Sequence, residues 1–240
     1  MEKVEAAHSE FNREDFETAR RRTRKAMDEL AELMQPGMTE EEGYALAQKA
    51  LKNLGVEKNW HRPFVRFGEN TLKQFGEPSV PGIVLKKSDI FFLDIGPVWK
   101  TGEIEYEGDA GCTYVVGPEG ADPMLEKLAR DVEEVFRETE AHWRKASATG
   151  RDLYEFAFAS AAKKGWLLLR ETNGHRLADF PHQIYYKGSL SDVDFHPSSG
   201  LWVLEIQIRH PELALGAFYE DALKLADLSV VSVKSDIVDS

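Results

Sequence analysis

Two pairs of acidic residues repeat each other along the chain at one offset. Asp94 lies in the apolar run 90–96 and precedes Asp109 by 15 residues, while Glu205 lies in the apolar run 201–206 and precedes Glu220 by 15 residues. Each member of the second pair follows its counterpart by 111 residues. An ionised carboxylate inside a buried strand is unfavourable unless a metal ion or hydrogen-bond donors compensate it. The four acids therefore predict one shared cation site built by two related halves.

A second set of residues supports an internal duplication. Three residues recur at an offset of 110, with Thr39, Tyr44 and Gly55 matched by Thr149, Tyr154 and Gly165. Both stretches predict helices, and the spacing of Thr39 and Glu42 is that of a capping box. No Ser/Gly/Pro-rich linker separates the halves. We therefore expect residues 1–240 to form a single catalytic domain, built from a duplication of about 12–117 and 122–234, with no extra N-terminal domain.

The apolar periodicity predicts alternating helices and strands. Helices are expected at 12–34, 39–54, 122–146 and 151–164. Strands are expected at 63–67, 81–85, 90–95, 112–117, 166–170, 183–187, 201–208 and 222–233. This pattern indicates an α+β fold whose sheet carries the acidic residues and whose helices pack on the other face.

Composition excludes several classes of protein. The net charge of −12 disfavours a nucleic-acid partner, and the basic residues at 20–25 are interpreted as a solvated helix face, because acidic residues flank them. Cys112 is the one cysteine, which rules out an intramolecular disulfide and is typical of a reducing compartment. No apolar stretch is long enough to span a membrane, and the first residues lack a signal-peptide pattern. We therefore expect no membrane association and a cytoplasmic location.

His175, in the sequence Asn173-Gly-His175, is a fifth candidate ligand. A histidine after a glycine is more often structural when considered alone, but neutral imidazole is a common metal ligand beside carboxylates. Two aspartates, two glutamates and one histidine suit manganese, iron(II), cobalt or zinc, and bridging carboxylates can hold two ions close together.

Short motifs along residues 12–234 resemble those of a metallopeptidase family. The motifs are the helix-hairpin turn at 36–40, the metal-binding strands at 93–96 and 108–117, the histidine motif at 174–175, and the final ligand strands at 204–205 and 219–221. The family includes methionine aminopeptidase, aminopeptidase P, prolidase and creatinase. The resemblance implies the pita-bread fold, in which two pseudo-symmetric lobes share a curved, largely antiparallel sheet covered by helices on one face.

The resemblance also implies the roles of individual residues. Two divalent ions would be held by Asp94, Asp109, His175, Glu205 and Glu220. A metal-bound hydroxide would attack an amide carbonyl, with Glu205 as ligand and general base. His182 matches a second family histidine, which would hydrogen-bond the substrate carbonyl or the tetrahedral intermediate. For His61, a direct catalytic role and packing at the rim both stay open.

Several departures from the family pattern indicate an altered substrate. The stretch Arg176-Leu-Ala-Asp179 follows the histidine where small residues are usual, which is expected to place charges of both signs near the metal centre. Residues 100–107 are expected to form an acidic hairpin beside the site. Loops 66–81 and 187–200, or a second copy in a homodimer, are candidates for closing the cleft. Phe75 and Phe195 in these loops either shape a pocket or anchor the loops.

Three functions remain open. The favoured one is a metal-dependent hydrolase of the aminopeptidase or dipeptidase type that acts on short peptides. The alternative is a creatinase-like hydrolase or lyase that acts on a small amide metabolite. A non-catalytic binding module is disfavoured, because all five candidate ligands are intact.

Overall fold

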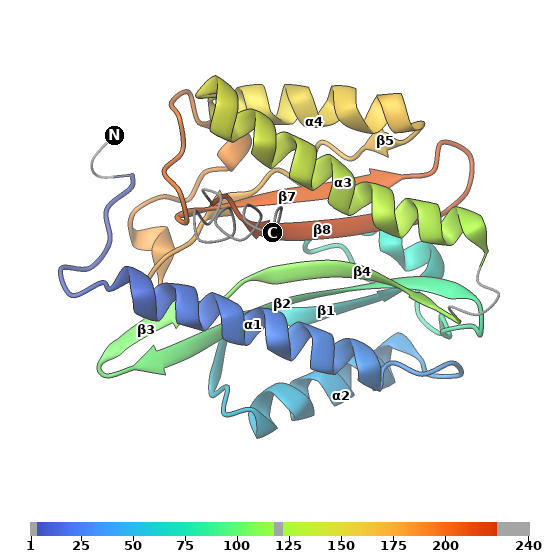
Figure 1. Ribbon diagram of the computed structural model, residues 1–240. Coiled ribbons are helices and arrows are strands. Elements are labelled where there is room, and N and C mark those ends of the chain that lie inside the picture. The colour runs from blue at the N-terminus through green and yellow to red at the C-terminus, as the bar shows by residue number, and fades with distance from the viewer. Residues whose placement is uncertain (1–3, 118–121, 225–240) are drawn as a thin grey trace, which may run out of the picture.

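The computed structural model describes residues 4–117 and 122–224 of the protein (Figure 1). The helices are α1 (Arg13–Leu33), α2 (Glu40–Asn53), α3 (Pro123–Ala146) and α4 (Gly150–Lys164). The strands are β1 (Lys58–Phe67), β2 (Asp89–Thr101), β3 (Ile104–Glu107), β4 (Ala110–Val116), β5 (Leu167–Leu168), β6 (His175–Arg176), β7 (Trp202–Arg209) and β8 (Gly216–Ala222). Short 3-10 helices lie at η1 (Gly68–Leu72), η2 (His182–Ile184) and η3 (Leu190–Asp192).

The strands form one open antiparallel sheet. Its main path runs β1-β2-β4-β8-β7-β5, with β3 paired to β2 and β6 paired to β7. Strands from the first half of the chain therefore meet strands from the second half where β4 pairs with β8. The expected α+β class with a largely antiparallel sheet is confirmed, while the origin of the two halves by duplication stays a prediction.

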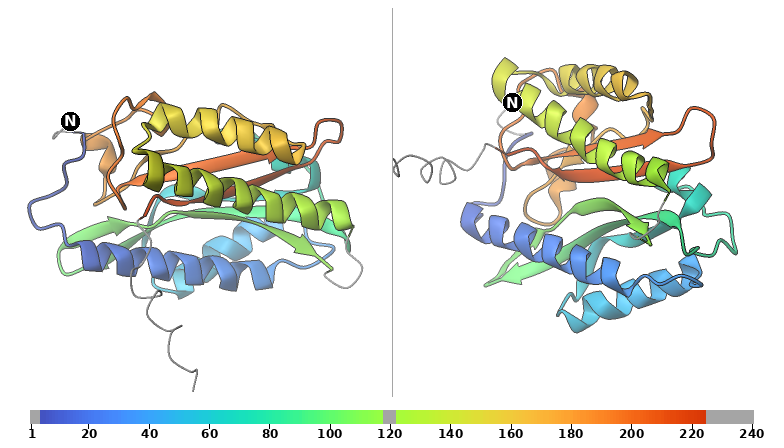
Figure 2. Two further views of the ribbon diagram at one scale, coloured as in Figure 1. Left: turned by 45° about the horizontal axis from the view of Figure 1, so that its top comes forward. Right: turned by 45° about the vertical axis from the view of Figure 1, so that its right-hand side comes forward.

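Each half of the sheet carries its own pair of helices. Helices α1 and α2 lie against the strands of the first half, and α3 and α4 lie against those of the second half (Figures 1 and 2). The predicted capping box at Thr39 and Glu42 is confirmed at the start of α2. Thr149 caps α4 with the same reciprocal geometry through Asp152, so both helices begin where the sequence satisfies their first N–H groups.

Alternation along the strands separates the hydrophobic core from the acidic residues. Leu93 and Ile95 of β2 belong to the core beneath α1 and α2, and Leu204 of β7 belongs to the core beneath α3 and α4. Successive side chains of a strand point to opposite faces of the sheet. Asp94 and Glu205 therefore face away from the helices, as the sequence predicted.

Two predicted strands are wrong. Residues 81–85 make only an isolated bridge between Val84 and Thr39, because Pro81 lacks an N–H and Gly82 has a φ of 77° that breaks the extended chain. The stretch 183–187 instead follows η2, and Ile184 is 64% exposed. The strand predicted at 166–170 is limited to Leu167–Leu168. The strand predicted at 222–233 begins and ends earlier, as β8, and residues 225–233 lie outside the described residues.

The basic residues of α1 also differ from the prediction. Arg20 is 4% exposed and its Nη2 lies 2.5 Å from Asp221 Oδ1, while Arg24 Nη2 lies 3.2 Å from Asp221 Oδ2. The interpretation as a solvated face is therefore wrong for these two arginines, although Arg21 and Arg22 are exposed. Their partner in β8 is 201 residues away from Arg20 in the chain, so no local pattern could indicate it. Within residues 4–117 and 122–224, no helix is long and apolar enough to cross a membrane.

Candidate metal centre

Three of the predicted ligands lie in one row across the middle of the sheet. Asp94 of β2 is opposite Gly111 of β4, Gly111 is opposite Glu220 of β8, and Glu220 is opposite Glu205 of β7. A Cβ atom at Gly111 would come within 2.3 Å of the Phe218 ring and 3.0 Å of Glu220 Cγ. Glycine therefore leaves space for the Glu220 side chain, and four adjacent strands bring the acids together.

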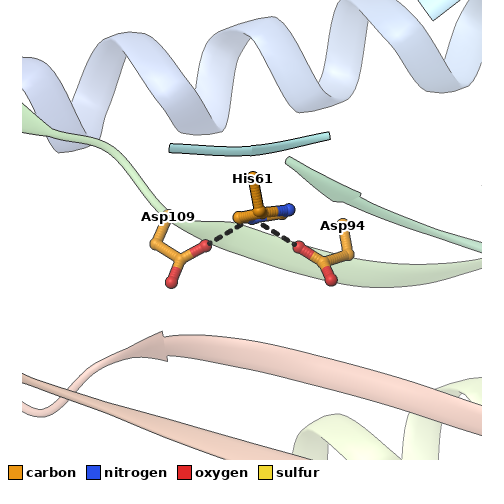
Figure 3. Close-up of side chains that lie close together, drawn as sticks. All are labelled: His61, Asp94 and Asp109. Atoms are coloured by element: carbon orange, nitrogen blue, oxygen red, sulfur yellow. Dashed lines mark ion pairs between the residues drawn. The ribbon is translucent and has the colours of Figure 1, made fainter. Parts of the chain in front are cut away.

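Asp109 and two histidines complete the cluster. Asp109 immediately precedes β4, and its Oδ2 lies 2.9 Å from His175 Nε2 in β6. His61 of β1 lies between two carboxylates, with Nε2 3.3 Å from Asp94 Oδ1 and 3.5 Å from Asp109 Oδ1 (Figure 3). These three residues each offer a ligand atom within 4.8 Å of the others. His61 is 9% exposed, so its place is within the cluster and not at the rim.

The histidines present a lone pair to the carboxylates. His175 Nδ1 lies 2.6 Å from the Arg176 carbonyl oxygen, and His61 Nδ1 lies 2.8 Å from that of Arg62. A carbonyl only accepts, so Nδ1 carries the hydrogen in both rings and Nε2 is the nitrogen available to a metal. A neutral Nε2 that faces a carboxylate oxygen requires a proton or a cation between them.

The electrostatics of the cluster are those of crowded, buried acids. Burial raises the pKa of Asp94 to about 7, with the charges of Asp109 and Glu205 acting in the same direction and His61 opposing them. Burial, together with the negative charges of Asp109, Asp94 and Glu205, also raises the pKa of Glu220 well above its ordinary value. Burial by itself would raise the pKa of Asp109, yet hydrogen bonds from His175 and His61 lower that pKa to about 2.

The histidines respond in the opposite direction. Burial by itself would lower the pKa of His61, but Asp94 and Asp109 outweigh it and raise the pKa to about 9. Asp109 and Glu205 raise the pKa of His175 to about 9 against the same effect of burial. Both shifts show that the cluster attracts positive charge.

The donor set fits divalent metal ions. Asp94 Oδ1, both carboxylate oxygens of Asp109, and Glu220 Oε1 are buried and lack a hydrogen-bond partner. Unpaired buried oxygens are unfavourable unless a cation compensates them. Carboxylate oxygens with imidazole nitrogens are ligands that suit manganese, iron, cobalt and zinc.

A cavity of about 450 Å³ opens above the cluster. Asp94, His175, His182 and Glu205 line its polar side. Its apolar wall consists of Trp60, Phe64, Phe75, Phe92 and Phe218. Pockets of about 300–1,000 Å³ with apolar walls and a few polar groups are typical of small-ligand sites. The arrangement can therefore hold a small molecule against the predicted ligands.

The two loops expected near the cleft contribute differently. Phe75, in loop 66–81, is 71% exposed, lines the cavity, and has its ring centroid 5.2 Å from that of Phe64. Phe195, in stretch 187–200, packs against Trp202 with a centroid distance of 6.0 Å and is absent from the cavity lining. Phe75 therefore shapes the cavity, whereas Phe195 anchors its loop.

The expectation of charged groups from 176–179 near the metal centre is wrong. Arg176 is fully buried, and its guanidinium donates to the carbonyl oxygens of Val4, Ala6, Leu177 and Leu201. It follows His175 directly in β6, so its side chain points to the opposite face. The segment at residues 4–8 thus packs against the strand that carries the predicted histidine ligand.

Sequence reasoning missed residues that support the predicted site. Glu107 is 1% exposed and contacts His182; its position in the acidic hairpin, two residues before Asp109, was the available signal. The Tyr154 hydroxyl lies 3.2 Å from the Glu205 carbonyl oxygen and 3.4 Å from its backbone nitrogen. Its recurrence as the counterpart of Tyr44 was noted, but it was assigned only to a helix.

Comparison with protein families matches residues 14–211 to Metallopeptidase family M24. The chain belongs to this family. The resemblance seen in the sequence is therefore confirmed, the protein is a metal-dependent peptidase, and the family's use of divalent metals agrees with the cluster of His61, Asp94 and Asp109. A search of curated proteins gave no match.

Solved structures share the fold. Methionine aminopeptidase from Thermotoga maritima has a TM-score of 0.65 and 17% identity, with 87% of this chain and 90% of that chain covered. X-Pro aminopeptidase from Thermotoga maritima has 0.68 and 19%, with 88% and 58% covered. Prolidase from Pyrococcus horikoshii has 0.66 and 20%, with 86% and 57% covered. The chain therefore spans less than three fifths of the latter two proteins, and the predicted pita-bread fold is confirmed.

Proposed function

We propose that this peptidase is an aminopeptidase or dipeptidase that cleaves short peptides at a dinuclear metal centre. The observation that carries the proposal is the row of Asp94, Glu220 and Glu205 beside Asp109 and His175, several of whose buried oxygens lack hydrogen-bond partners, at the base of the cavity. These five residues are the proposed ligands for two ions of manganese, iron, cobalt or zinc. Bound divalent ions supply Lewis acidity and activate water near neutral pH.

The chain's own residues supply the proton transfer and positioning. Gly174 N–H donates to Glu205 Oε2 at 2.8 Å, which fixes the carboxylate beside the cavity. We assign Glu205 as the general base that takes a proton from the attacking water and delivers it to the leaving amine. His61 is assigned a direct role at the cluster, because its Nε2 is the atom between Asp94 and Asp109.

The cavity favours a short substrate with an apolar side chain. Its aromatic wall offers apolar contact area, and its volume of about 450 Å³ is enough for a peptide of a few residues at most. This size supports short peptides over folded proteins as substrates. We also propose a cytoplasmic location from the single cysteine, and a homodimer in which a second copy covers the loop around Phe75.

Turnover of a panel of dipeptides to tetrapeptides by the manganese- or cobalt-loaded protein tests the proposal. We expect release of the amino-terminal residue, and a fall in kcat of at least about 100-fold in Glu205→Gln, because general-base catalysis contributes about 10²–10⁴-fold. Glu212→Gln, at an exposed acid between β7 and β8, is the matched control and should leave turnover unchanged. Inactivity on every peptide by the metal-loaded protein would refute the proposal. Consumption of small non-peptide amides instead would support the creatinase-like alternative.

A further inference from the structure

Glu107 is a buried acid whose hydrogen bonds all come from one segment of the chain. It ends β3 and is 1% exposed. Its Oε1 accepts a hydrogen bond from His182 N at 3.0 Å, and its Oε2 accepts one from Ala178 N at 3.4 Å. His182 Nδ1 lies 2.8 Å from the same Oε2. The carboxylate therefore contacts both the backbone and the ring of His182.

These contacts decide which ring nitrogen of His182 carries the hydrogen. Backbone N–H groups can only donate, so both oxygens of Glu107 are acceptors, and an ionised carboxylate has no hydrogen to offer the ring. His182 Nδ1 must therefore be the donor in this contact. In the neutral ring, Nε2 then has a lone pair and acts as a hydrogen-bond acceptor.

The ring of His182 is held on further sides. It stacks on His175 with a centroid distance of 5.4 Å and an interplanar angle of 24°. The Trp60 ring meets it edge-on at 5.4 Å and 83°. His182 is 4% exposed and lines the cavity. Because Glu107 takes Nδ1, the nitrogen left for a molecule in the cavity is Nε2.

Resting on the proposed function, we propose that Glu107 is a positioning residue that holds His182 in its Nδ1–H form, so that Nε2 accepts a hydrogen bond from an N–H group of the peptide substrate. This differs from the role that the family resemblance implied, in which His182 donates to a carbonyl or oxyanion. The N–H group is either the amino terminus of the peptide or the scissile amide. Both are hydrogen-bond donors of the same kind.

Nitrogen-15 NMR of histidine-labelled protein, metal-free and zinc-loaded, tests the assignment at alkaline pH, where the ring is neutral. The signal of His182 is identified by its loss in His182→Gln. We expect a pyrrole-type Nδ1 and a pyridine-type Nε2. In Glu107→Gln, an amide that accepts from His182 N must turn its NH₂ group toward Nδ1, which favours the Nε2–H form. An Nε2–H ring in the unaltered protein, or no change in the variant, would overturn the proposal.

Kinetics on a dipeptide separates positioning from a merely structural role. Glu107→Gln and His182→Gln should each lower kcat/KM by about 10–100-fold. The double variant should be no slower than His182→Gln, because the two residues act as one unit. Glu105→Gln, at a partly exposed acid of the same hairpin that pairs with Lys58, is the control and should match the unaltered protein. Multiplicative losses in the double variant would overturn the proposal.

Metal binding and substrate choice complete the test. Calorimetric titration with manganese should give the same affinity for Glu107→Gln as for the unaltered protein, and a weaker affinity would show that Glu107 acts through Asp109 instead. Peptides with a scissile X-Ala or X-Pro bond distinguish the two N–H sources, since the X-Pro amide has none. If no peptide is cleaved, the proposed function fails, but the NMR result still decides the role of Glu107.

Discussion

Asp221 joins the predicted ligand Glu220 to helix α1. Its carboxylate lies 2.5 Å from Arg20 Nη2 and 3.2 Å from Arg24 Nη2, and Asp221 and Arg20 are each at most 5% exposed. Arg24 also donates to the carbonyl oxygen of Glu220. Asp221→Asn removes the negative charge between the two arginines and leaves Arg20 buried beside a neutral amide. We expect the fold around β8 to lose stability.

The size of the loss follows from burial. Removing one partner of a buried ion pair costs about 3–5 kcal/mol. Each kcal/mol lowers Tm by about 2–4 °C in a chain of this size, so the expected fall is about 6–20 °C. Glu17→Gln is the matched control, because Glu17 also contacts Arg20, at 2.8 Å, but its side chain is 40% exposed. Exposed pairs contribute about 0–1 kcal/mol, so this variant should unfold close to the unaltered protein.

The pH dependence gives the same prediction a second readout. Burial by itself would raise the pKa of Asp221, but Arg24 and Arg20 hold that pKa well below its ordinary value. A lowered folded-state pKa stabilises the fold above the unfolded pKa of about 3.9, and this stabilisation is lost as the pH falls further. The deficit of Asp221→Asn, measured by urea unfolding followed by circular dichroism, should therefore narrow in acid. A deficit below about 1 kcal/mol at neutral pH, or one of constant size, would refute this reasoning.

Two further substitutions test the packing around the site. Gly96→Ala places a methyl 2.3 Å from a His61 ring carbon and 2.4 Å from Trp60 Nε1; overpacking costs about 1–3 kcal/mol, and the displaced His61 should weaken manganese binding in calorimetry, whereas an unchanged affinity would argue against His61 at the centre. Glu5→Gln removes the charge that accepts hydrogen bonds from Trp202 Nε1 at 2.8 Å and from its neighbouring loop; we expect the free energy of unfolding to fall by about 1–3 kcal/mol in urea, and an unchanged value would show that residues 4–8 are not an anchor.

The sequence contains enough information to place the acids on one face of the sheet. Asp94 and Glu205 alternate with large apolar residues, and this period of two predicts that they face away from the helices. Their meeting depends on the pairing of β4 with β8, which joins residues more than 100 positions apart. Only the internal repeat and the family resemblance gave a signal for that pairing. Local patterns would have left two unconnected pairs of acids.

Other features depend on contacts that no local pattern records. Arg176 follows a predicted ligand and was expected near the metals, but the carbonyl oxygens of Val4 and Ala6 hold it on the opposite face. The position of His61 depends on a β1–β2 pairing with irregular register between residues 59 and 64. A period of two cannot predict which way a side chain points where the register shifts. The sequence therefore left the role of His61 open.

Metal content tests the central claim most directly. Elemental analysis of the protein, after manganese loading and removal of free metal, should give about two equivalents if the five residues form a dinuclear centre. Asp109→Asn should lose metal, because Asp109 lies between His61 and His175 in the cluster. Glu105→Gln, at the partly exposed acid of the same hairpin, should retain it. Equal metal content in the unaltered protein and Asp109→Asn would contradict the assignment of this cluster as the metal centre.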